Sequence, residues 1–362
     1  MVVATGGSQR ATRNDTVNHV RIEEFAVTGA DSLLQPIRGD VVAYVEFLQR
    51  SEYDVVLVNA WQNWATDLVL KHIKQIRGRK FLYSHCISTN AFFAHQPFRS
   101  LLRYLAWRPY WWGVKRHMQA LDGIIFLAER GMDSRFDDRV IARECSVTAH
   151  VIPNSISKQA LIVLQLPAKR MVDRDQLIAV GSYYWQKGFD FILRAYAASR
   201  AKNCIPLKFF GQERSVFTEK LRRLAVSLGI EYGFVVFNEG ISGVELLQEY
   251  GRARLLLLGS HSECQPLVIL DANASGTPFV ARSTGCIDQM PGGASVKTVV
   301  AMASEIDAMI SDPVLWQQVS NAGRVAASGL YHPDRVGRLL LNTIEASFNA
   351  DRGKAHEKRT YD

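Results

Sequence analysis

The sequence SHSECQPLVILDANASG occupies residues 260–276 and follows a short apolar run at residues 255–258, which predicts a buried strand. Proline at the first position of a helix and glycine just after its last residue are typical helix boundaries, so Pro266 and Gly276 predict a helix between them. Because this segment is apolar nearly all round, we expect the helix to be buried.

Two carboxylates interrupt this apolar segment. Glu263 lies just before the predicted helix and Asp271 lies about one turn inside it. A buried helix rarely carries an acid without a partner. The free backbone N–H groups at the start of such a helix form a ready site for an anion. Glu263 and Asp271 therefore flank a predicted phosphate site, with a sugar on one side and a ribose hydroxyl on the other.

Composition and charge narrow the class of protein. A length of 362 residues predicts two domains, and 48% hydrophobic residues suffice for packed cores. The formal net charge of +8 favours an anionic partner: a nucleotide, a phospholipid surface or nucleic acid. The sequence has neither a membrane-spanning apolar run nor a signal peptide, so we expect a cytoplasmic protein. The scattered cysteines form no Cys/His cluster, so no metal site is indicated.

Apolar runs of strand length alternate with segments of helical spacing along the chain. This alternation predicts an α/β protein with parallel, doubly wound sheets. Residues 6–17 are mostly small and polar and are expected to form a loop. Strands are expected at residues 1–5, 19–27, 55–60, 80–84, 123–128, 150–152, 177–181, 206–210, 234–237, 254–258 and 278–281.

The alternation stops and restarts near the middle of the chain, which predicts two domains in tandem. Parallel sheets bind ligands at the carboxyl ends of their strands, so the expected site is the cleft between the domains. The predicted division is a first domain at residues 1–157, a polar linker at 158–176, a second domain at 177–335, and a C-terminal helix and tail at 336–362.

Four segments of the second half form a pattern of fixed order and spacing. They are AVGSYYWQKGFDFILRAY at residues 179–196, KFFGQE at 208–213, the pattern of Leu246 and Tyr250 before an apolar strand, and residues 260–276. In the first half, Ser84-His85 follows a strand and Ile152-Pro153-Asn154 lies at the end of the domain. Together these segments resemble the retaining glycosyltransferases of family 4. That family has the GT-B fold, in which two Rossmann-like domains face each other across a cleft.

The resemblance implies an enzyme that moves a sugar from a nucleotide-sugar to a saccharide, lipid-linked or small acceptor, with retention at the anomeric carbon. It implies no cofactor and no metal ion, because cationic side chains and the helix start serve the phosphates. The resemblance implies that Glu263 contacts the donor sugar and that Asp271 binds the ribose hydroxyls. Lys187 and the backbone N–H groups of Leu267 and Val268 would bind the diphosphate, and Gly181 and Gly211 would help to bind the donor. His85 would make a catalytic contact with the sugar from the opposite domain.

The sequence departs from the family pattern at three places. Ser182 stands where the family usually has arginine, a loss for which Arg282 or Arg214 could compensate. The second acid is Asp271 rather than glutamate. At the front, the family's first strand, glycine-rich turn and first helix are absent, and we expect that the chain begins late. The alternative is an inactive GT-B-like protein that binds a nucleotide or a partner, and a nucleotide-sugar epimerase is a third hypothesis.

Each candidate residue also has a structural interpretation. Glu263 is an acid at a helix start, where the helix dipole favours it. Asp271 fits a buried structural hydrogen bond, Lys187 fits a solvated turn, and His85 fits a satisfied residue after a strand.

Residues 96–117, QPFRSLLRYLAWRPYWWGVKRH, combine basic and aromatic residues on a predicted helix. Phe98, Leu101, Leu102 and Leu105 fall on one helical face, and five basic residues lie around a cluster of tryptophan and tyrosine. This pattern suits an anionic membrane surface. The alternative is that the apolar face packs on the domain and the aromatic residues line the acceptor cleft. No nucleic-acid module is present, so nucleic-acid binding is not expected.

Overall fold

A computed structural model describes residues 1–15, 20–29, 36–50, 52–87, 90, 92–93, 96–132, 134–212, 216–241 and 243–359. The chain divides into two compact units. Unit 1 contains residues 1–129, 134–151 and 343–362, and unit 2 contains residues 130–133 and 152–342. The predicted linker at residues 158–176 belongs to unit 2 and includes helix α5 (Lys158–Gln165).

Unit 2 is built on one sheet whose described strands are all parallel. Their order across the sheet is β12-β11-β10-β13-β14-β15, so the chain starts in the middle, runs outward to one edge, returns, and runs to the other edge. This is the doubly wound order, with its switch point between β10 and β13. The bounds are β10 Gln176–Val180, β11 Leu207–Gly211, β12 Val235–Glu239, β13 Ala253–Leu258, β14 Phe279–Arg282 and β15 Gly293–Val296.

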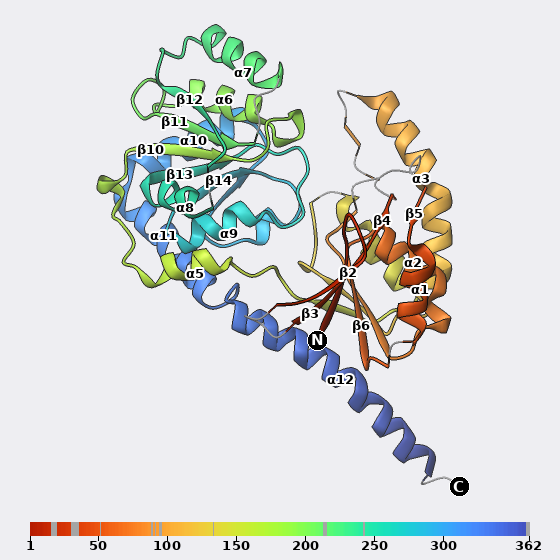
Figure 1. Cartoon of the computed structure of the whole chain (residues 1–362). Helices are drawn as coiled ribbons and strands as arrows, with labels where there is room; N and C mark the ends of the chain where they lie inside the picture. Colours follow the sequence, from red (N-terminus) through yellow and green to blue (C-terminus); the bar gives the residue numbers. More distant parts are fainter. Residues whose placement is uncertain are drawn as a thin grey trace. The chain divides into compact units, whose positions relative to one another are not determined.

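Helices cover both faces of this sheet (Figure 1). One layer contains α6 (Phe189–Ala198), α7 (Val216–Ser227) and α10 (Val299–Ser311), in which α6 contacts both other helices. The other layer contains α5, α8 (Gly243–Arg252), α9 (Leu267–Ala274) and α11 (Pro313–Ser328). Helix α12 (Pro333–Arg359) begins after these elements.

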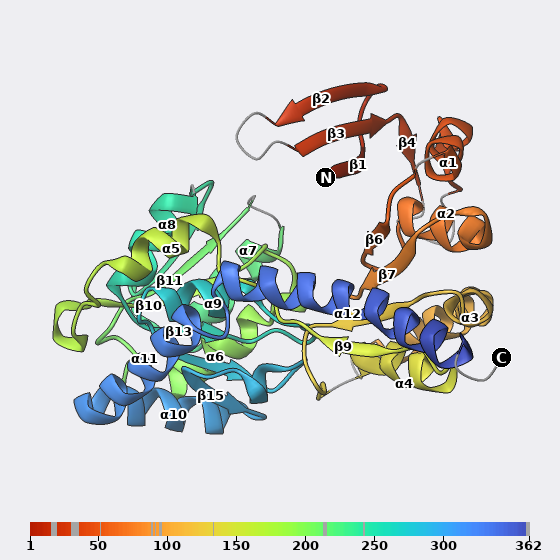
Figure 2. The same ribbon diagram turned by 90° about the horizontal axis from the view of Figure 1, so that it is seen from below.

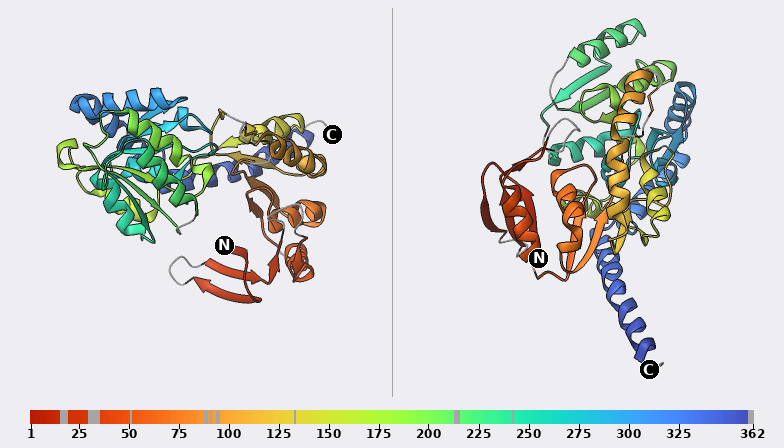
Figure 3. Two further views of the ribbon diagram at one scale, coloured as in Figure 1. Left: turned by 90° about the horizontal axis from the view of Figure 1, so that it is seen from above. Right: turned by 90° about the vertical axis from the view of Figure 1, so that its right-hand side faces the viewer.

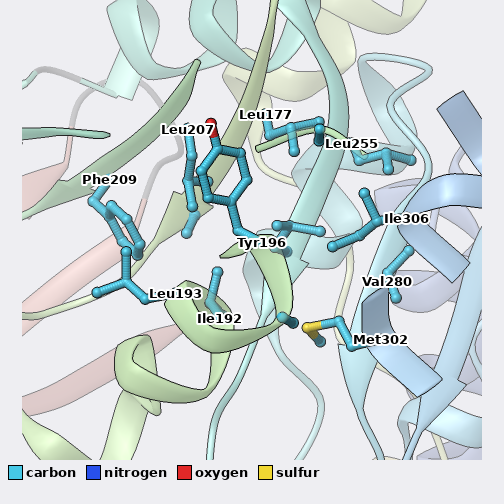
Figure 4. Packing of buried hydrophobic residues seen from close by; sticks show 14 of the residues in the cluster. Leu177, Ile192, Leu193, Tyr196, Leu207, Phe209, Leu255, Val280, Met302 and Ile306 are labelled. Carbon is cyan, nitrogen blue, oxygen red and sulfur yellow. The ribbon is translucent and has the colours of Figure 1, made fainter. Parts of the chain in front are cut away.

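One hydrophobic cluster of unit 2 lies between the sheet and the α6 layer. Alternate strand residues such as Leu207 and Phe209 point to the same face, because side chains alternate along a strand. Ile192, Leu193 and Tyr196 of α6 pack against them, as Figure 4 shows. The Tyr196 hydroxyl donates to the carbonyl of Ile205 at 3.1 Å, which satisfies the one polar group of this fully buried side chain.

Unit 1 contains a parallel four-stranded sheet, β6-β7-β8-β9, and a three-stranded sheet, β1-β3-β2. In the second sheet β1 is parallel to β3 and β2 is antiparallel to it. Figure 2 shows these three strands together near the N-terminus. The bounds are β1 Val2–Gly6, β2 Ala11–Asp15, β3 Val20–Phe25, β4 Val27–Thr28, β5 Arg38–Gly39, β6 Val55–Asn59, β7 Arg79–Tyr83, β8 Gly123–Phe126 and β9 Ala149–Val151.

The helices of unit 1 are α1 (Val41–Arg50), α2 (Trp64–His72), α3 (Pro97–Met118) and α4 (Asp137–Glu144). Their buried side chains share one core with the strands, and the rings of Phe25 and Tyr44 meet edge to face at 5.1 Å. The last part of α12 also belongs to this unit, where Arg79 donates to the carbonyl of Ser347 at 3.1 Å.

The structure corrects three expectations. Part of the predicted loop at residues 6–17 forms β2, although its sequence ATRND has little strand preference, because β3 offers a full edge for pairing. Strand β15 was missed, since its sequence GASV is short and lacks an apolar run. Pro266 is the residue before α9 rather than its first helical residue.

Arg174 connects several elements of unit 2 from a fully buried position. Its guanidinium donates to the carbonyls of Ala253, Ser275 and Gly276 and to the Thr277 hydroxyl, at 2.7–3.1 Å. Burial lowers its pKa to about 10, so the group stays charged at neutral pH. Arg174 therefore satisfies carbonyl groups after the end of α9 and fixes that end of the helix.

Replacing Arg174 by alanine should lower the free energy of unfolding by more than about 3 kcal/mol, because several buried acceptors lose their donor at once. Urea unfolding measures this change. Arg170→Ala is the control, since Arg170 makes an exposed ion pair with Asp173. We expect less than about 1 kcal/mol for this control. Equal losses in the two variants would contradict the role assigned to Arg174.

Candidate functional site

Two loops meet at the switch point of the unit 2 sheet, where the chain leaves β10 and β13 by their carboxyl ends. Lys187 follows β10 and Glu263 follows β13. The Lys187 ammonium donates to a Glu263 carboxylate oxygen at 2.8 Å, and the side chains are 26% and 13% exposed. Such a pair is accessible to a ligand yet partly shielded from water. The structure therefore brings together two of the predicted site residues.

Glycine backbones bring these two loops into contact. Gly188 has a φ of 58°, and a Cβ on it would overlap the carbonyl oxygen of Gly259. A Cβ on Gly259 would in turn overlap the carbonyl oxygen of Gly188. The amide of His261 also donates to the carbonyl of Gln186 at 2.8 Å. Lys187 and Glu263 can meet because no side chain separates the two backbones.

Gly181 and Gly211 form the floor of this region at the ends of β10 and β11. A Cβ on Gly181 would lie 3.2 Å from the aliphatic carbons of Lys187, so the lysine stem runs over this glycine. A Cβ on Gly211 would overlap the carbonyl oxygen of Gly181 and crowd the ring of Tyr183. Both glycines therefore permit a close approach of backbone and side chain at the carboxyl edge of the sheet.

Helix α9 starts directly after the loop that carries Glu263. Its interior residues are buried as predicted, but Leu267 is 57% exposed at the first turn. The first N–H groups of a helix, here those of Leu267 and Val268, have no acceptor within the helix. They carry the positive end of the helix dipole, which favours an anion.

Asp271 lies one turn further along α9 and is mostly buried. Its Oδ1 accepts a hydrogen bond from the Ser157 hydroxyl at 3.3 Å. Burial raises the pKa of Asp271 to about 6, against the effect of the hydrogen bonds from Ser157. Complete burial raises the pKa of Tyr250 well above its ordinary value, and the charge of Asp271 adds to this effect. Asp271 is thus a carboxylate that burial destabilises and that is ionised only above about pH 6.

Arg282 ends β14 at the same edge of the sheet. It donates to Nδ1 of His261 at 2.9 Å, and its guanidinium lies over the ring of Phe191. Partial burial lowers its pKa, and the charge of Asp190 opposes that effect. A second cation therefore lies beside the loop that carries Glu263. Arg214, the other predicted replacement for the missing arginine, lies outside the described residues.

His85 belongs to unit 1, where it follows β7. One ring nitrogen, Nε2, lies 2.7 Å from Oδ1 of Asn59, the last residue of β6. The ring also lies against Tyr83, with centroids 5.2 Å apart. Burial lowers the pKa of His85, so the imidazole is neutral at physiological pH. Because Asn59 Oδ1 only accepts, the proton of the neutral ring is on Nε2.

The structure gathers the predicted donor residues of unit 2 at one edge of its sheet, and it places His85 in a separate unit. Their functional roles stay predictions. Sequence reasoning missed Ser157, Asn59 and the pairing of Arg282 with His261. The sequence did contain a signal for Asn59, because this polar residue directly follows the apolar run VVLV of a predicted strand. Within the described ranges, no group of three or more His, Cys, Asp or Glu residues is arranged to hold a metal ion.

Part of unit 2 matches a family of known proteins. Residues 174–312 match the family model of glycosyl transferases group 1. An uncharacterized glycosyltransferase of Haemophilus influenzae is 26% identical over 174 residues, which cover 44% of this chain and 47% of that protein. The D-inositol 3-phosphate glycosyltransferase of Acidothermus cellulolyticus is 32% identical over 153 residues, or 41% of this chain and 32% of that protein. The chain thus spans less than half the length of these relatives.

The fold extends the similarity to nearly the whole chain. The structure of the sucrose-phosphate synthase from Thermosynechococcus elongatus superposes with a TM-score of 0.70, covering 96% of this chain and 88% of that one at 18% identity. The expected α/β fold is therefore confirmed as the GT-B fold, and the match of residues 174–312 lies within its second unit.

Replacing Asp271 by asparagine should raise the free energy of unfolding by about 3 kcal/mol at pH 7. The folded pKa of about 6 exceeds the ordinary value of 3.8, so the folded state binds more protons between these values. Ionisation of Asp271 therefore costs stability as the pH rises through 6. The gain should therefore be much smaller at pH 4 than at pH 7, and it disappears only well below the ordinary pKa of 3.8, where the carboxyl is protonated in both states.

Urea unfolding at pH 4 and pH 7 tests this sign. Asp175→Asn is the control, because the ion pair of Asp175 with Arg252 lowers the pKa of Asp175 against the opposing effect of burial. That variant should lose stability at pH 7. A loss of stability at pH 7 in Asp271→Asn as well would show that the carboxylate is structurally required.

Proposed function

We propose that the protein transfers a sugar from a nucleotide-sugar donor to a saccharide, lipid-linked or small acceptor, with retention at the anomeric carbon. The proposal extends the glycosyl transferases group 1 match of residues 174–312 to the activity of the chain. We further propose that it works in the cytoplasm without a metal ion or other cofactor.

One observation carries this proposal: the contact of Lys187 with Glu263 at the switch point of the unit 2 sheet. Ligands of doubly wound sheets bind where the strand order reverses. A cation for phosphate, an acid for sugar hydroxyls and the start of α9 occur together at this point. The residues therefore supply each kind of contact that a nucleotide-sugar requires.

The chemistry of transfer follows from where charge develops. As the bond to the sugar breaks, negative charge accumulates on the departing nucleoside diphosphate. Lys187 and the N–H groups of Leu267 and Val268 would stabilise this charge, which lowers the barrier. Glu263 would accept hydrogen bonds from the donor sugar, and Asp271 from the ribose hydroxyls. His85, neutral at physiological pH, would contact the transferred sugar.

Arg282 is proposed as the second phosphate cation, in place of the arginine that Ser182 replaces. To bind phosphate its guanidinium keeps the stacking on Phe191 and exchanges the hydrogen bond to His261 for one to the ligand. Arginine suits this role because its fork of N–H donors can bind more than one oxygen.

Nucleoside diphosphates should stabilise the folded protein in a thermal-shift titration with UDP, GDP and ADP. A ligand at one hundred times its dissociation constant adds about 2.7 kcal/mol to the free energy of unfolding. One of the three should raise the melting temperature, and Lys187→Ala and Asp271→Ala should each weaken its binding at least about tenfold, because each removes a charged contact.

Lys202→Ala is the matched control, since Lys202 donates to the carbonyl of Leu228 instead of lying at the sheet edge. Its nucleotide affinity should equal that of the parent. The sugar esters of the nucleotide that binds are then incubated with the protein, and product analysis by NMR gives the anomeric configuration. If the folded parent is stabilised by none of the three nucleotides, the proposed donor site is wrong.

Helix α3, the long orange helix in the right panel of Figure 3, presents an apolar surface in its first half. Phe98 is 79% exposed, and Leu102 and Leu105 are 59% and 55% exposed. The alternative that this face packs on the domain is therefore wrong. The second half of α3 does pack inward, through Trp111, Val114 and Met118.

The charge of α3 matches this apolar surface to one kind of partner. Residues 97–118 contain five basic residues, Arg99, Arg103, Arg108, Lys115 and Arg116, and no acid. Exposed leucine and phenylalanine interleaved with arginine suit the headgroup region of an anionic bilayer. We therefore propose that α3 rests on such a membrane. No helix in the described part of the chain is long and apolar enough to cross one.

The double variant Leu102→Ser and Leu105→Ser should bind vesicles of phosphatidylglycerol and phosphatidylcholine at least tenfold more weakly than the parent in co-sedimentation. It loses the apolar burial of two leucine side chains, each about 1.5 kcal/mol or more. Val226→Ser with Val244→Ser, two exposed sites of unit 2, is the control and should bind as the parent does. Equal binding of the parent to pure phosphatidylcholine would contradict the role of the basic residues.

A further inference from the structure

Two loops of unit 1 carry unusual backbone strain. The structure describes five non-glycine residues with positive φ, and three of them lie at the carboxyl ends of β6 and β7. Ala60 and Gln62 follow β6 with φ of 64° and 57°, and Cys86 follows β7 with φ of 66°. Such conformations each cost about 1–3 kcal/mol, and they persist only where surrounding contacts hold them.

These strained loops present Asn59 and His85, whose side chains hydrogen-bond to each other at 2.7 Å. Asn59 precedes Ala60 directly, and His85 precedes Cys86 directly. The position of each side chain therefore depends on the strained residue beside it. If either loop moved by about one ångström, the hydrogen bond between Asn59 and His85 would break. That hydrogen bond sets the tautomer of His85.

One buried carboxylate contacts both loops. Asp138 lies in the first turn of α4, fully buried, and its Oδ2 accepts a hydrogen bond from the Trp61 indole at 2.8 Å. The same oxygen accepts a short hydrogen bond from the Ser84 hydroxyl. Trp61 lies between Ala60 and Gln62, and Ser84 directly precedes His85. Asp138 thus joins the two loops that carry Asn59 and His85.

Ser84 extends this connection to the turn after β7. Its backbone N–H donates to the carbonyl of Ile125 on β8 at 2.8 Å, and its hydroxyl oxygen accepts from the N–H of Cys86 at 3.1 Å. The hydroxyl thereby satisfies a buried N–H in the strained turn while donating its own proton to Asp138. Because the hydroxyl donates to Asp138 and accepts from Cys86 at the same time, the Ser84 side chain has a defined orientation.

We propose that Asp138 is a positioning residue: by binding Trp61 and Ser84 together it holds Asn59 against His85 and keeps the imidazole in the Nε2-protonated form. Only the role of His85 in sugar transfer rests on the proposed function; the positioning role of Asp138 does not. Burial raises the pKa of Asp138 to about 6, against the hydrogen bonds from Ser84 and Trp61. The contacts at Oδ2 thus offset part of the cost of a buried charge.

The test is the state of His85, read by NMR of protein with nitrogen-15 in its nine histidines, with His85→Gln to assign the signal. In the parent, the pKa of His85 should lie below its ordinary value and the neutral ring should be protonated on Nε2. In Asp138→Ala and Ser84→Ala the pKa should rise towards its ordinary value and the two tautomers should become comparable. Asp138→Asn, which keeps an accepting oxygen, should restore most of the parent state.

Glu23→Gln is the matched control, because Glu23 is another buried acid of unit 1 with two hydrogen-bond partners, Thr12 and Arg21, in a different sheet. It should leave the signal of His85 unchanged. Once a donor is known, Asp138→Ala should lower kcat at least tenfold with less than a twofold change in KM for that donor.

A folded Asp138→Ala variant with the parent pKa and tautomer of His85 would overturn the proposal. If that variant does not fold, Ser84→Ala and Trp61→Phe each remove a single hydrogen bond, and an unchanged His85 in both would overturn it equally. The NMR result needs no donor. A normal response of His85 with no transfer in any assay would therefore contradict the proposed function and leave the positioning role intact.

Discussion

The direct contact of two backbones, at Gly188 and Gly259, is the constraint on which the candidate donor site depends. A Cβ on either residue would overlap the carbonyl oxygen of the other. Without this contact the loops after β10 and β13 would be separated by at least a side chain, and Lys187 could not reach Glu263 at 2.8 Å. The doubly wound strand order places these loops next to each other, and the glycines then close the remaining distance.

The sequence predicted most of unit 2 because its signals are local. Apolar runs such as residues 255–258 predicted buried strands, and Pro266 with Gly276 predicted the bounds of α9 within a residue or two. Strands β2 and β15 escaped prediction, since pairing with a neighbouring strand decides their conformation and their own residues have little preference. Local patterns thus predict elements that residues favour by themselves, and they miss elements that tertiary contacts impose.

For the same reason, only part of the chemistry of the two sites could be predicted from the sequence. Glu263, Asp271 and Lys187 lie in motifs, but the partners that tune them come from elsewhere. Ser157 is 114 residues from Asp271 along the chain, and Asn59 is 26 residues from His85. Helix α3 shows a related limit: its spacing predicted an apolar face, but only the packing of the whole unit decides whether that face is covered.

Each unit contains a carboxyl group whose charged form is destabilised by burial, Asp271 in unit 2 and Asp138 in unit 1. Burial raises the pKa of each carboxyl to about 6, so each is ionised at neutral pH at a cost to stability. A neutral amide of the same shape would avoid that cost. We therefore propose that a ligand needs the charge of Asp271. The two strained loops beside Asp138 need an accepting oxygen, which an amide would also offer. Perturbed carboxyls concentrate at functional sites for this reason. Asp271 lies at the carboxyl edge of the unit 2 sheet, and Asp138 contacts the loops that follow β6 and β7 in unit 1. These two locations are a physical argument for function that does not depend on sequence similarity.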